Sequence, residues 1–337
     1  MQEALVKHAQ LREWCIRKFV GAGVSERDAA VAADVLVHAN LRGVDSHGVM
    51  RMPHYIDTIA ANGLNVNPHM RIRDTGPVTA IVDGDDGLGH VVAEKAMSHA
   101  IEKAKLNGVG AVSAVNSSHC GALSYFVNMA ADQGLIGVMM TNTDKMVAPF
   151  GGSAPYFGTN PMAFAFPAGD LPPIIVDMAT SSVAYGKILD AIRQGKPIPP
   201  DWAVNEAGEP ITDPALFSAL LPFGGAKGYA LGMVVDLFSG MLTGSPVGPY
   251  VSPMYADDLS ERRKLGHFML AIDIGRFTNA ESYAANMKRM VQDLGAMPPA
   301  PGYAQVMLPG EPERRRAQIR LADGIPLTED LIDYLRP

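Results

Sequence analysis

From Val78 onward the chain alternates short apolar segments with longer amphipathic ones, and this alternation limits its possible folds more than any other feature. "TAIVDG" and "VGAVSAV" are typical of strands, and "GHVVAEKAMSHAIEKAKLNG" between them is typical of a helix that Gly108 ends. After a loop come a helical pattern, "LSYFVNMAADQG", and another strand, "LIGVMMTN". Such alternation predicts an α/β fold with a sheet that is at least partly parallel. Functional groups are then expected in loops beyond the strands' carboxyl ends, where "NSSHCGA" places His119.

Size and composition narrow the class of protein. A chain of 337 residues is too long for one small core, and its net charge of −7 without a basic tract argues against nucleic-acid or anionic-membrane partners. No apolar run reaches the ~18–20 residues that a membrane span needs. The nearest candidate, "YALGMVVDLFSGML", contains Asp236 and is expected to be a buried element. Cys15 and Cys120 form no disulfide framework, so we expect a cytoplasmic protein that acts on small molecules.

The segment "VDSHGVMRMPHY" concentrates titratable side chains directly after a helical stretch. Ser46 is placed to cap a new helix, on which His47, Arg51 and Tyr55 would follow at intervals of four residues and share one face. Pro53 would kink a helix interior, since it lacks an amide donor. The pattern therefore predicts a short or bent helix in which His47 and Arg51 are neighbours.

Several common catalytic motifs do not occur in the sequence. There is no H-E-x-x-H, and the nine histidines show no metal-ligand spacing with cysteines or acids, so we expect no metal site. The G-x-S-x-G elbow and the G-x-x-x-x-G-K-[ST] phosphate loop do not occur either. Nor does G-x-G-x-x-G, so a dinucleotide would have to bind without the usual Rossmann turn.

Five side chains are candidates for chemistry, and each also has a simpler interpretation. Oxidation of a hydroxy acid needs a proton acceptor and a cation for the carboxylate, which His47 and Arg51 could supply unless they merely lie on a solvated helix. His119 is a second acid/base candidate, or only a hydrogen-bonding loop histidine. Asp177, after the apolar run "PIIV", could accept from a ribose hydroxyl or cap the next turn. Lys227, between glycines, could meet a phosphate at a helix N-terminus or be an exposed loop lysine.

An ordered set of motifs extends over nearly the whole chain: "LRGVDSHGVMRMPHY", "NSSHCGALSYF", "VAPFGGSAPYFGTNPMAFAFP", "IVDMATSSVAYGKI", "AKGYALGMVVDLFSGMLTG" and "PAPGYAQVMLPGE". The set resembles the type-2 malate/L-lactate dehydrogenase family. The resemblance implies a non-Rossmann α/β fold, with a mixed sheet and flanking helices, and homodimers or assemblies of dimers. It also implies an N-terminal helical segment, 1–75, on which 303–337 packs back, and an α/β dinucleotide- and substrate-binding region, 76–302.

The resemblance further implies roles for individual residues. The S-H-G histidine, His47, would donate or accept the proton, and His119 would be a catalytic base in some members. Ser46 and Arg51 would contact the substrate, with Tyr55 nearby. NAD, or NADP as the alternative, would be held by a further set of residues: Thr143, Asp177, Met178, Ala179, Lys227, Gly310 and Glu311.

The implied activity is transfer of a hydride between a nicotinamide cofactor and a small 2-hydroxy acid. "HCGALSYFV", "YVSPMYADDL" and "PAPGYAQVMLPG" look most like the branch of the family that oxidises (S)-ureidoglycolate to oxalurate with NAD in allantoin breakdown. Malate, lactate or sulfolactate oxidation, and reduction of cyclic imines or diketogulonate, are alternatives within the family. Outside it, a cofactor-free hydrolase or lyase, or a silent dimeric binding protein, stays open.

Overall fold

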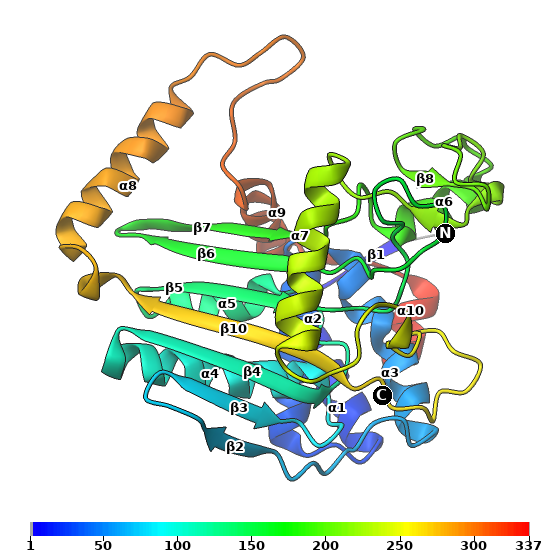
Figure 1. Ribbon diagram of the computed structural model, residues 1–337, viewed down its shortest axis with the longest axis horizontal. Helices are drawn as coiled ribbons and strands as arrows, with labels where there is room; N and C mark the ends of the chain where they lie inside the picture. The colour runs from blue at the N-terminus through cyan, green and yellow to red at the C-terminus, as the bar shows by residue number, and fades with distance from the viewer. Residues whose placement is uncertain (1–2, 337) are drawn as a thin grey trace.

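The computed structural model describes residues 3–336, and within them a seven-stranded mixed sheet forms the centre of the molecule (Figure 1). The strand order is β2-β3-β4-β10-β5-β6-β7. β3 and β4 run parallel, whereas every other neighbouring pair is antiparallel. The strands are β2 Arg71–Asp74, β3 Thr79–Asp83, β4 Val109–Ser117, β5 Leu135–Thr141, β6 Met162–Ala168, β7 Leu171–Met178 and β10 Leu265–Asp273. The predicted α/β fold with a mixed sheet is confirmed.

Strand β10 sets the directions of its neighbours. It lies between β4 and β5 and is antiparallel to both, so β4 and β5 point the same way without touching. β7 is likewise separated from β5 by the antiparallel β6. The carboxyl ends of β4, β5 and β7 therefore meet at one edge of the sheet. The sequence pattern did not predict a strand at "LGHFMLAID", so the element that creates this arrangement was unexpected.

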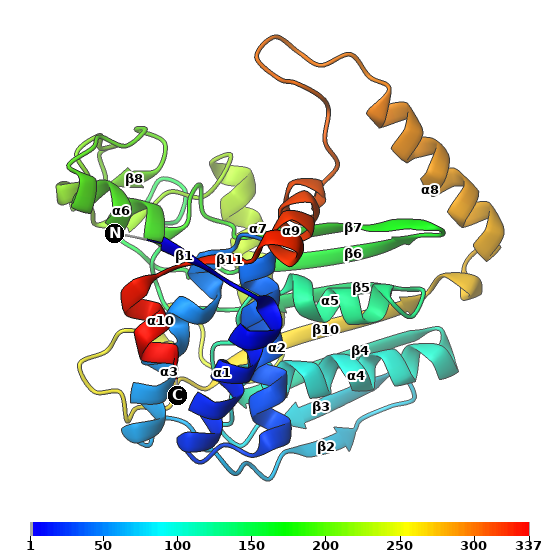
Figure 2. The same ribbon diagram turned by 180° about the vertical axis from the view of Figure 1, so that it is seen from behind.

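Two helices cover one face of the sheet (Figure 2). Helices α4 (Gly89–Asn107) and α5 (Ser124–Ala131) bury an apolar core with the strands' inner side chains, which include Val112, Met139 and Met269. A Cβ on Gly110 would lie 2.0 Å from the Ala100 carbonyl oxygen, so only glycine lets α4 approach β4 this closely. α4 ends as predicted, with Gly108 at φ 90°.

A second core lies beside the sheet, where the two ends of the chain meet (Figure 2). β1 pairs antiparallel with β11, and these strands pack with the N-terminal helices and α10. The elements are β1 Glu3–Val6, α1 His8–Gly21, α2 Glu26–Leu41, α3 Met52–Ala60, β11 Ile325–Thr328 and α10 Glu329–Leu335. The division of the chain near residues 75 and 302 stays a prediction.

The opposite face of the sheet is only partly covered (Figure 1). Helix α7 (Ala226–Asp236), continued by a π-helical turn, Leu237–Met241, crosses it near one edge. Helix α8 (Ala280–Gly295) extends away from the body. α6 (Tyr185–Gln194), β8 (Ala203–Val204) and β9 (Ala219–Leu220) form a small lobe, and α9 (Glu311–Asp323) lies near β7. In the part of the chain that the structure describes, no helix has the length and apolarity needed to cross a membrane.

The expectation that "YALGMVVDLFSGML" is a buried element is wrong for the single chain. Along its helix, Leu237, Met241 and Leu242 are 47%, 62% and 61% exposed. They follow Leu231 and Val234 at helical spacing, so one side of the helix presents a continuous apolar stripe to solvent.

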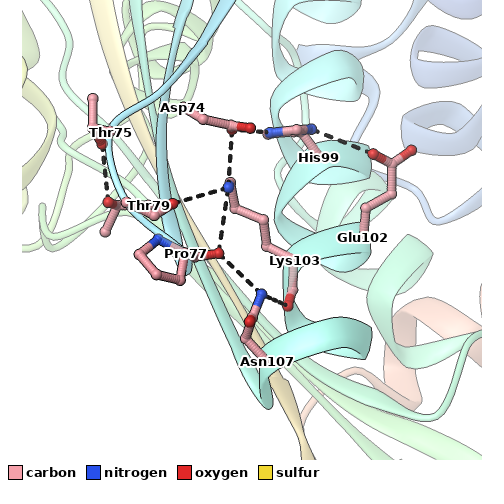
Figure 3. A network of polar contacts seen from close by, with 9 residues as sticks. Asp74, Thr75, Pro77, Thr79, His99, Glu102, Lys103 and Asn107 are labelled. Atoms are coloured by element: carbon pink, nitrogen blue, oxygen red, sulfur yellow. Dashed lines mark hydrogen bonds and ion pairs between the residues drawn. The ribbon is translucent and has the colours of Figure 1, made fainter.

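A polar network fastens edge strand β2 to helix α4 (Figure 3). Asp74 accepts hydrogen bonds from His99 at 2.8 Å and forms an ion pair with Lys103 at 2.9 Å. His99 also lies 3.3 Å from Glu102, and Lys103 donates to the Gly76 carbonyl at 3.2 Å. Hydrogen bonds from His99 and then from Lys103 hold the pKa of Asp74 below its usual value. This network ties the sheet edge to the helix that covers it.

Candidate active site

The segment that follows α2 is a pair of short 3₁₀ turns rather than the single helix expected. The turns are Asp45–His47 and Val49–Arg51, and α3 begins directly after them. Pro53 lies in the first turn of α3, where its missing N–H has no intrahelical partner to lose. Ser46 does not cap a helix, because its hydroxyl instead lies 3.0 Å from Nδ1 of His47.

Asn40, on α2, holds both turns in place, and sequence analysis missed it. Its amide nitrogen donates to Asp45 at 2.7 Å, and its oxygen accepts from the Val49 amide at 2.8 Å. A Cβ on Gly48 would lie 2.2 Å from that oxygen, so the S-H-G glycine is required by this close approach. Asn40 is 1% exposed, and its hydrogen bonds fix where His47 and Arg51 point.

The structure brings the two predicted catalytic histidines together. The rings of His47 and His119 stack with centroids 5.7 Å apart, although the residues lie on different elements. His119 comes from the loop after β4, as expected, and its Nδ1 lies 2.6 Å from the Tyr55 hydroxyl. Ser46, His47, Tyr55 and His119 are therefore joined by direct contacts within one small site.

Both histidines are neutral near pH 7. Burial lowers the pKa of His47 to about 4, and the positive charge of Arg51 lowers it further. Burial also lowers the pKa of His119 well below its ordinary value, with His47 and Arg51 as the next causes. No ion pair with a carboxylate involves either ring among residues 3–336. A neutral imidazole can accept a proton from a substrate hydroxyl.

Tyr55 determines which nitrogen of His119 carries the proton. Tyr55 is 2% exposed, and its ring lies edge-on to His90 with centroids 4.9 Å apart. Burial raises the pKa of the phenol, so it stays protonated. Within the described chain the hydroxyl has one hydrogen-bond partner, Nδ1 of His119, and donating to it is the one way to satisfy the phenolic proton. This donation leaves the ring proton of His119 on Nε2.

Arg51 is held by its inner nitrogen and leaves its outer ones available. Nε donates to the Ser46 carbonyl oxygen at 2.7 Å. The terminal nitrogens form no ion pair or hydrogen bond with any residue from 3 to 336. The Tyr255 ring, 5.6 Å from the guanidinium, supports it from one side by a cation–π contact. The two free nitrogens suit a two-pronged contact with a carboxylate.

Another histidine connects the two strand ends that carry the site. His267, on β10, is fully buried, and its two ring nitrogens each lie 2.7 Å from a hydroxyl, those of Thr141 and Ser117. These hydroxyls lie at the ends of β5 and β4, so His267 fixes the two loops relative to each other. Burial lowers its pKa to about 3, which keeps it neutral. A histidine inside an apolar strand pattern was the available signal, and it was not used.

The predicted cofactor residues lie along the same edge of the sheet and beyond it. Thr143 follows β5 and accepts from the Thr159 amide at 2.9 Å. Asp177 ends β7 with Met178, ahead of Ala179, and accepts from the Ser124 amide at 2.7 Å. Lys227 is exposed in the first turn of α7. No hydrogen bond in the described part of the chain joins these residues to the histidine pair.

The remaining cofactor candidates lie at the start of α9. Gly310 has φ 80°, and a Cβ there would lie 2.7 Å from the Ile175 carbonyl oxygen. Glu311 accepts from the Leu308 amide at 3.0 Å and so closes this turn. Nearby, Nε of Arg42 is buried without a partner, in the field of Asp177 and Glu313. Exposed helix amides, cations and a carboxylate fit the phosphates and ribose hydroxyls of a dinucleotide.

A cavity of about 490 Å³ lies at the other end of α7 from the π-helical turn. It is lined by the loop around Gly151 and Gly152, by Ser182 after β7, and by Gly224 and Gly225 before α7. Neither histidine of the pair lines it. The chemistry of the side chains, rather than the size of the hollow, identifies the candidate active site.

Comparison with known proteins places this geometry in a family. Residues 6–336 match the sequence profile of malate/L-lactate dehydrogenase. The chain belongs to the malate/L-lactate dehydrogenase family. An Escherichia coli O157:H7 protein named ureidoglycolate dehydrogenase (NAD(+)) is 41% identical over 98% of this chain and 94% of its own. A (2R)-3-sulfolactate dehydrogenase (NADP(+)) from Chromohalobacter salexigens is 34% identical over 93% and 92%.

The fold agrees with the same family. The structure of sulfolactate dehydrogenase from Methanocaldococcus jannaschii superposes with a TM-score of 0.93 and 38% identity, covering 99% of this chain and 96% of that one. As a malate/L-lactate dehydrogenase family member, the chain is an NAD(P)-dependent dehydrogenase that acts on the CH–OH group of 2-hydroxy acids. The predicted family, fold and enzyme class are confirmed.

Proposed function

We propose that this dehydrogenase oxidises (S)-ureidoglycolate to oxalurate with NAD, and that the stacked, neutral pair His47 and His119 beside the free guanidinium of Arg51 carries the reaction. Arg51 holds the substrate carboxylate between its two terminal nitrogens. Ser46 is fixed by its contact with His47 and lies within reach of the same anion. NAD, when bound, supplies the acceptor for the substrate's Cα hydrogen.

The two histidines then have different tasks. Because Tyr55 donates to Nδ1 of His119, Nε2 of His119 carries a proton and donates to the substrate oxygen. His47, neutral at pH 7, accepts the hydroxyl proton. As negative charge develops on the oxygen, the His119 donor and the Arg51 cation stabilise it. Holding the reactants in this orientation can itself contribute ~7–11 kcal/mol relative to free encounter.

The choice of NAD rests on Asp177. A carboxylate at the end of a strand can accept from both ribose hydroxyls, whereas it repels the 2′-phosphate of NADP. Its other oxygen is fixed by the Ser124 amide at 2.7 Å. Lys227 and the amides of the α9 turn at Gly310 and Glu311 would contact the phosphates, with Thr143, Met178 and Ala179 along the same edge. The family also includes an enzyme named for NADP(+), so the cofactor has to be measured.

The choice of ureidoglycolate rests on the motifs around His119 and Tyr255 and on the similarity to the Escherichia coli enzyme. The test is the formation of reduced nicotinamide, followed by absorbance, with NAD and then NADP. Ureidoglycolate, malate, lactate and sulfolactate are the substrates, and cyclic imines and diketogulonate are run in reverse. We expect the highest kcat/KM for ureidoglycolate with NAD. A higher kcat/KM for another compound would identify that compound as the preferred substrate. The absence of turnover in either direction would rule out the proposed reaction.

We further propose that the enzyme is a homodimer and that the apolar stripe of α7 lies in its interface. Leu231, Val234, Leu237, Phe238, Met241 and Leu242 are 36–62% exposed in the single chain, a contiguous apolar surface of the kind that protein partners bury. Met241→Glu should reduce the mass measured by light scattering toward 35.9 kDa. Met297→Glu, at a residue 54% exposed elsewhere, is the matched control and should leave the mass unaltered. A wild-type mass of one chain would contradict the dimer.

A further inference from the structure

An ion pair lies beside the substrate-binding guanidinium and has no part in the mechanism above. Arg263, just before β10, pairs with Asp144, just after β5. Their side chains are 9% and 16% exposed, so solvent screens this pair little. Neither residue was among the candidates that the sequence suggested.

The pair lies at the same edge of the sheet as the loop that carries His119, because β10 begins beside the ends of β4 and β5, where Leu265 pairs with Ser117 and His267 with Thr141. The positive charge of Arg263 contributes to lowering the pKa values of His119 and His54, after burial. Asp144 is the carboxylate whose charge acts on Arg51. The Tyr255 ring lies 5.2 Å from that of His54, so it closes this side of the site as well as supporting Arg51.

Each member of the pair keeps one hydrogen-bonding position free. Arg263 donates from Nε to the Ser252 carbonyl oxygen at 3.0 Å and from Nη2 to Asp144 Oδ1. Its Nη1 and the Oδ2 atom of Asp144 have no hydrogen-bond partner among residues 3–336, and neither atom is buried from solvent. The pair therefore leaves N–H groups of Arg263 and one carboxylate oxygen of Asp144 available to a ligand.

The charges of the site favour a substrate with a single negative charge. Arg51 and Arg263 supply two positive charges, Asp144 supplies one negative charge, and the histidines are neutral. One substrate carboxylate on Arg51 therefore balances the charges of these side chains, and the positive nicotinamide of NAD is the one further charge that the reaction brings. A second anionic group at the substrate's far end would meet Asp144, whose charge already compensates Arg263, and like charges repel strongly in a poorly solvated site.

We infer that the Arg263–Asp144 pair is the specificity element for the far end of the substrate, and that it selects a neutral group with adjacent N–H and C=O, such as a carbamoyl or ureido group, over a second anion. Arg263 donates to the carbonyl oxygen of that group, and Asp144 accepts from its N–H. This inference rests on the proposed 2-hydroxy-acid dehydrogenase function and adds the residues that would distinguish ureidoglycolate from malate and sulfolactate.

The test compares substrates that differ at the far end. Asp144→Asn removes the acceptor charge, so the ratio of kcat/KM for ureidoglycolate to that for malate should fall by about 10- to 100-fold. The effect on lactate, which has a methyl group there, should be smaller than the effect on ureidoglycolate. Arg263→Lys, which keeps the charge but lacks the fork, should also weaken ureidoglycolate more than lactate. This second variant decides the matter if Asp144→Asn does not fold.

A neighbouring ion pair provides a matched control. Arg262 binds Asp86 at 3.0 Å, and the Asp86 side chain is 15% exposed. Neither residue contributes to the pKa shifts of His47, Arg51 or His119. Asp86→Asn should leave the ratio of ureidoglycolate to malate turnover within about twofold of wild type, since the charge of Asp86 acts on none of the three site residues.

A binding measurement separates this inference from the proposed reaction. Calorimetry with NAD present compares oxalurate with oxaloacetate, on the wild-type enzyme and on Asp144→Asn. Wild-type preference for oxalurate that Asp144→Asn abolishes supports the inference even if turnover is not seen, in which case the proposed reaction alone fails. Equal losses for all ligands in Asp144→Asn, or no wild-type preference, would overturn the inference while leaving a dehydrogenase intact.

Discussion

The molecule holds histidines in two opposite environments. In the network at the sheet edge, both nitrogens of His99 face carboxylates, Asp74 at 2.8 Å and Glu102 at 3.3 Å (Figure 3). In the active site, His47 and His119 face each other, two hydroxyl groups and a guanidinium. The first environment offers each ring nitrogen a carboxylate acceptor, whereas the second keeps its imidazoles neutral.

The difference shows what each region contributes. The network at His99 satisfies its charges internally and fastens β2 and the following turn to α4. The active site instead brings a cation close to two buried rings and leaves the outer nitrogens of Arg51 without a protein partner. Polar groups that lack a protein partner lower the stability of the fold. They are retained where a bound ligand supplies the missing partner. Substitutions in the two regions should therefore have opposite consequences for stability and activity.

The largest effect should follow removal of the proton acceptor. His47→Ala should reduce kcat about 10²–10⁴-fold, because it deletes the group that takes the hydroxyl proton. The free energy of unfolding should change little, because the imidazole of His47 is buried beside the positive charge of Arg51, and both surroundings reduce what the ring adds to stability. Steady-state kinetics and urea denaturation measure the two quantities, and NAD binding should persist. Turnover equal to wild type would exclude His47 from the chemistry.

Weakening the carboxylate contact should have the next largest effect. Arg51→Lys keeps the positive charge but cannot form a two-pronged contact, so KM for the hydroxy acid should rise about 10- to 100-fold, with a smaller change in kcat. Lys103→Arg, the opposite exchange in the sheet-edge network, should leave KM at its wild-type value. A normal KM in Arg51→Lys would mean that another cation holds the carboxylate.

In the sheet-edge network the expected effect falls on stability. Lys103→Met keeps the aliphatic stem but removes the contacts to Asp74 and to the Gly76 carbonyl. The free energy of unfolding should fall by about 1.5–3 kcal/mol, the contribution of a hydrogen bond from a charged group such as the one to the Gly76 carbonyl, because the exposed Asp74 carboxylate adds little. Thermal unfolding measures it, and kcat/KM should match wild type below the transition. A stable variant with impaired turnover would show that the two regions are coupled.

Much of this arrangement was predictable, for physical reasons that particular elements illustrate. The strands β3, β4 and β5 and helix α4 have regular apolar periods, and α4 ends at Gly108, so local pattern indicated them. His119 was predictable because loops after strand ends converge at one edge of the sheet. His47 and Arg51 stood out because acid/base and cationic groups lay within a few residues.

The rest depends on contacts between segments that are distant in the sequence. His267, Arg263 and Asp144 act through partners more than a hundred residues away, so even the visible histidine in the β10 strand pattern could not be related to the site from the sequence. The stripe on α7 was misjudged for a related reason: an apolar helix side is compatible with a buried core or with an interface, and its sequence is the same in both cases.

The pH dependence should separate the two environments further. Because the pKa of His47 is lowered to about 4, kcat/KM for oxidation should stay high well below pH 6.5 and fall only as the ring is protonated near pH 4. Over the same range the unfolded chain's histidine takes up a proton that the folded one excludes, so stability decreases as pH falls from 6.5 toward 4. His47→Gln should reduce that decrease. If kcat/KM instead falls at or above pH 6.5, the burial of His47 and His119 does not keep these histidines neutral.

The smallest change tests the assignment of the two histidines. In Tyr55→Phe the donor to Nδ1 of His119 is lost. A donor stabilises the neutral ring, so its loss should move the pKa of His119 upward, toward the ordinary value, as measured from the NMR shifts of the imidazole. Phe19→Tyr, in the ring next to Tyr55 at 6.3 Å, leaves that hydrogen bond in place and should not move the pKa of His119. A downward shift in Tyr55→Phe would instead mean that the phenol accepts from Nδ1–H. Nε2 of His119 would then be free, and His119 rather than His47 would be the proton acceptor.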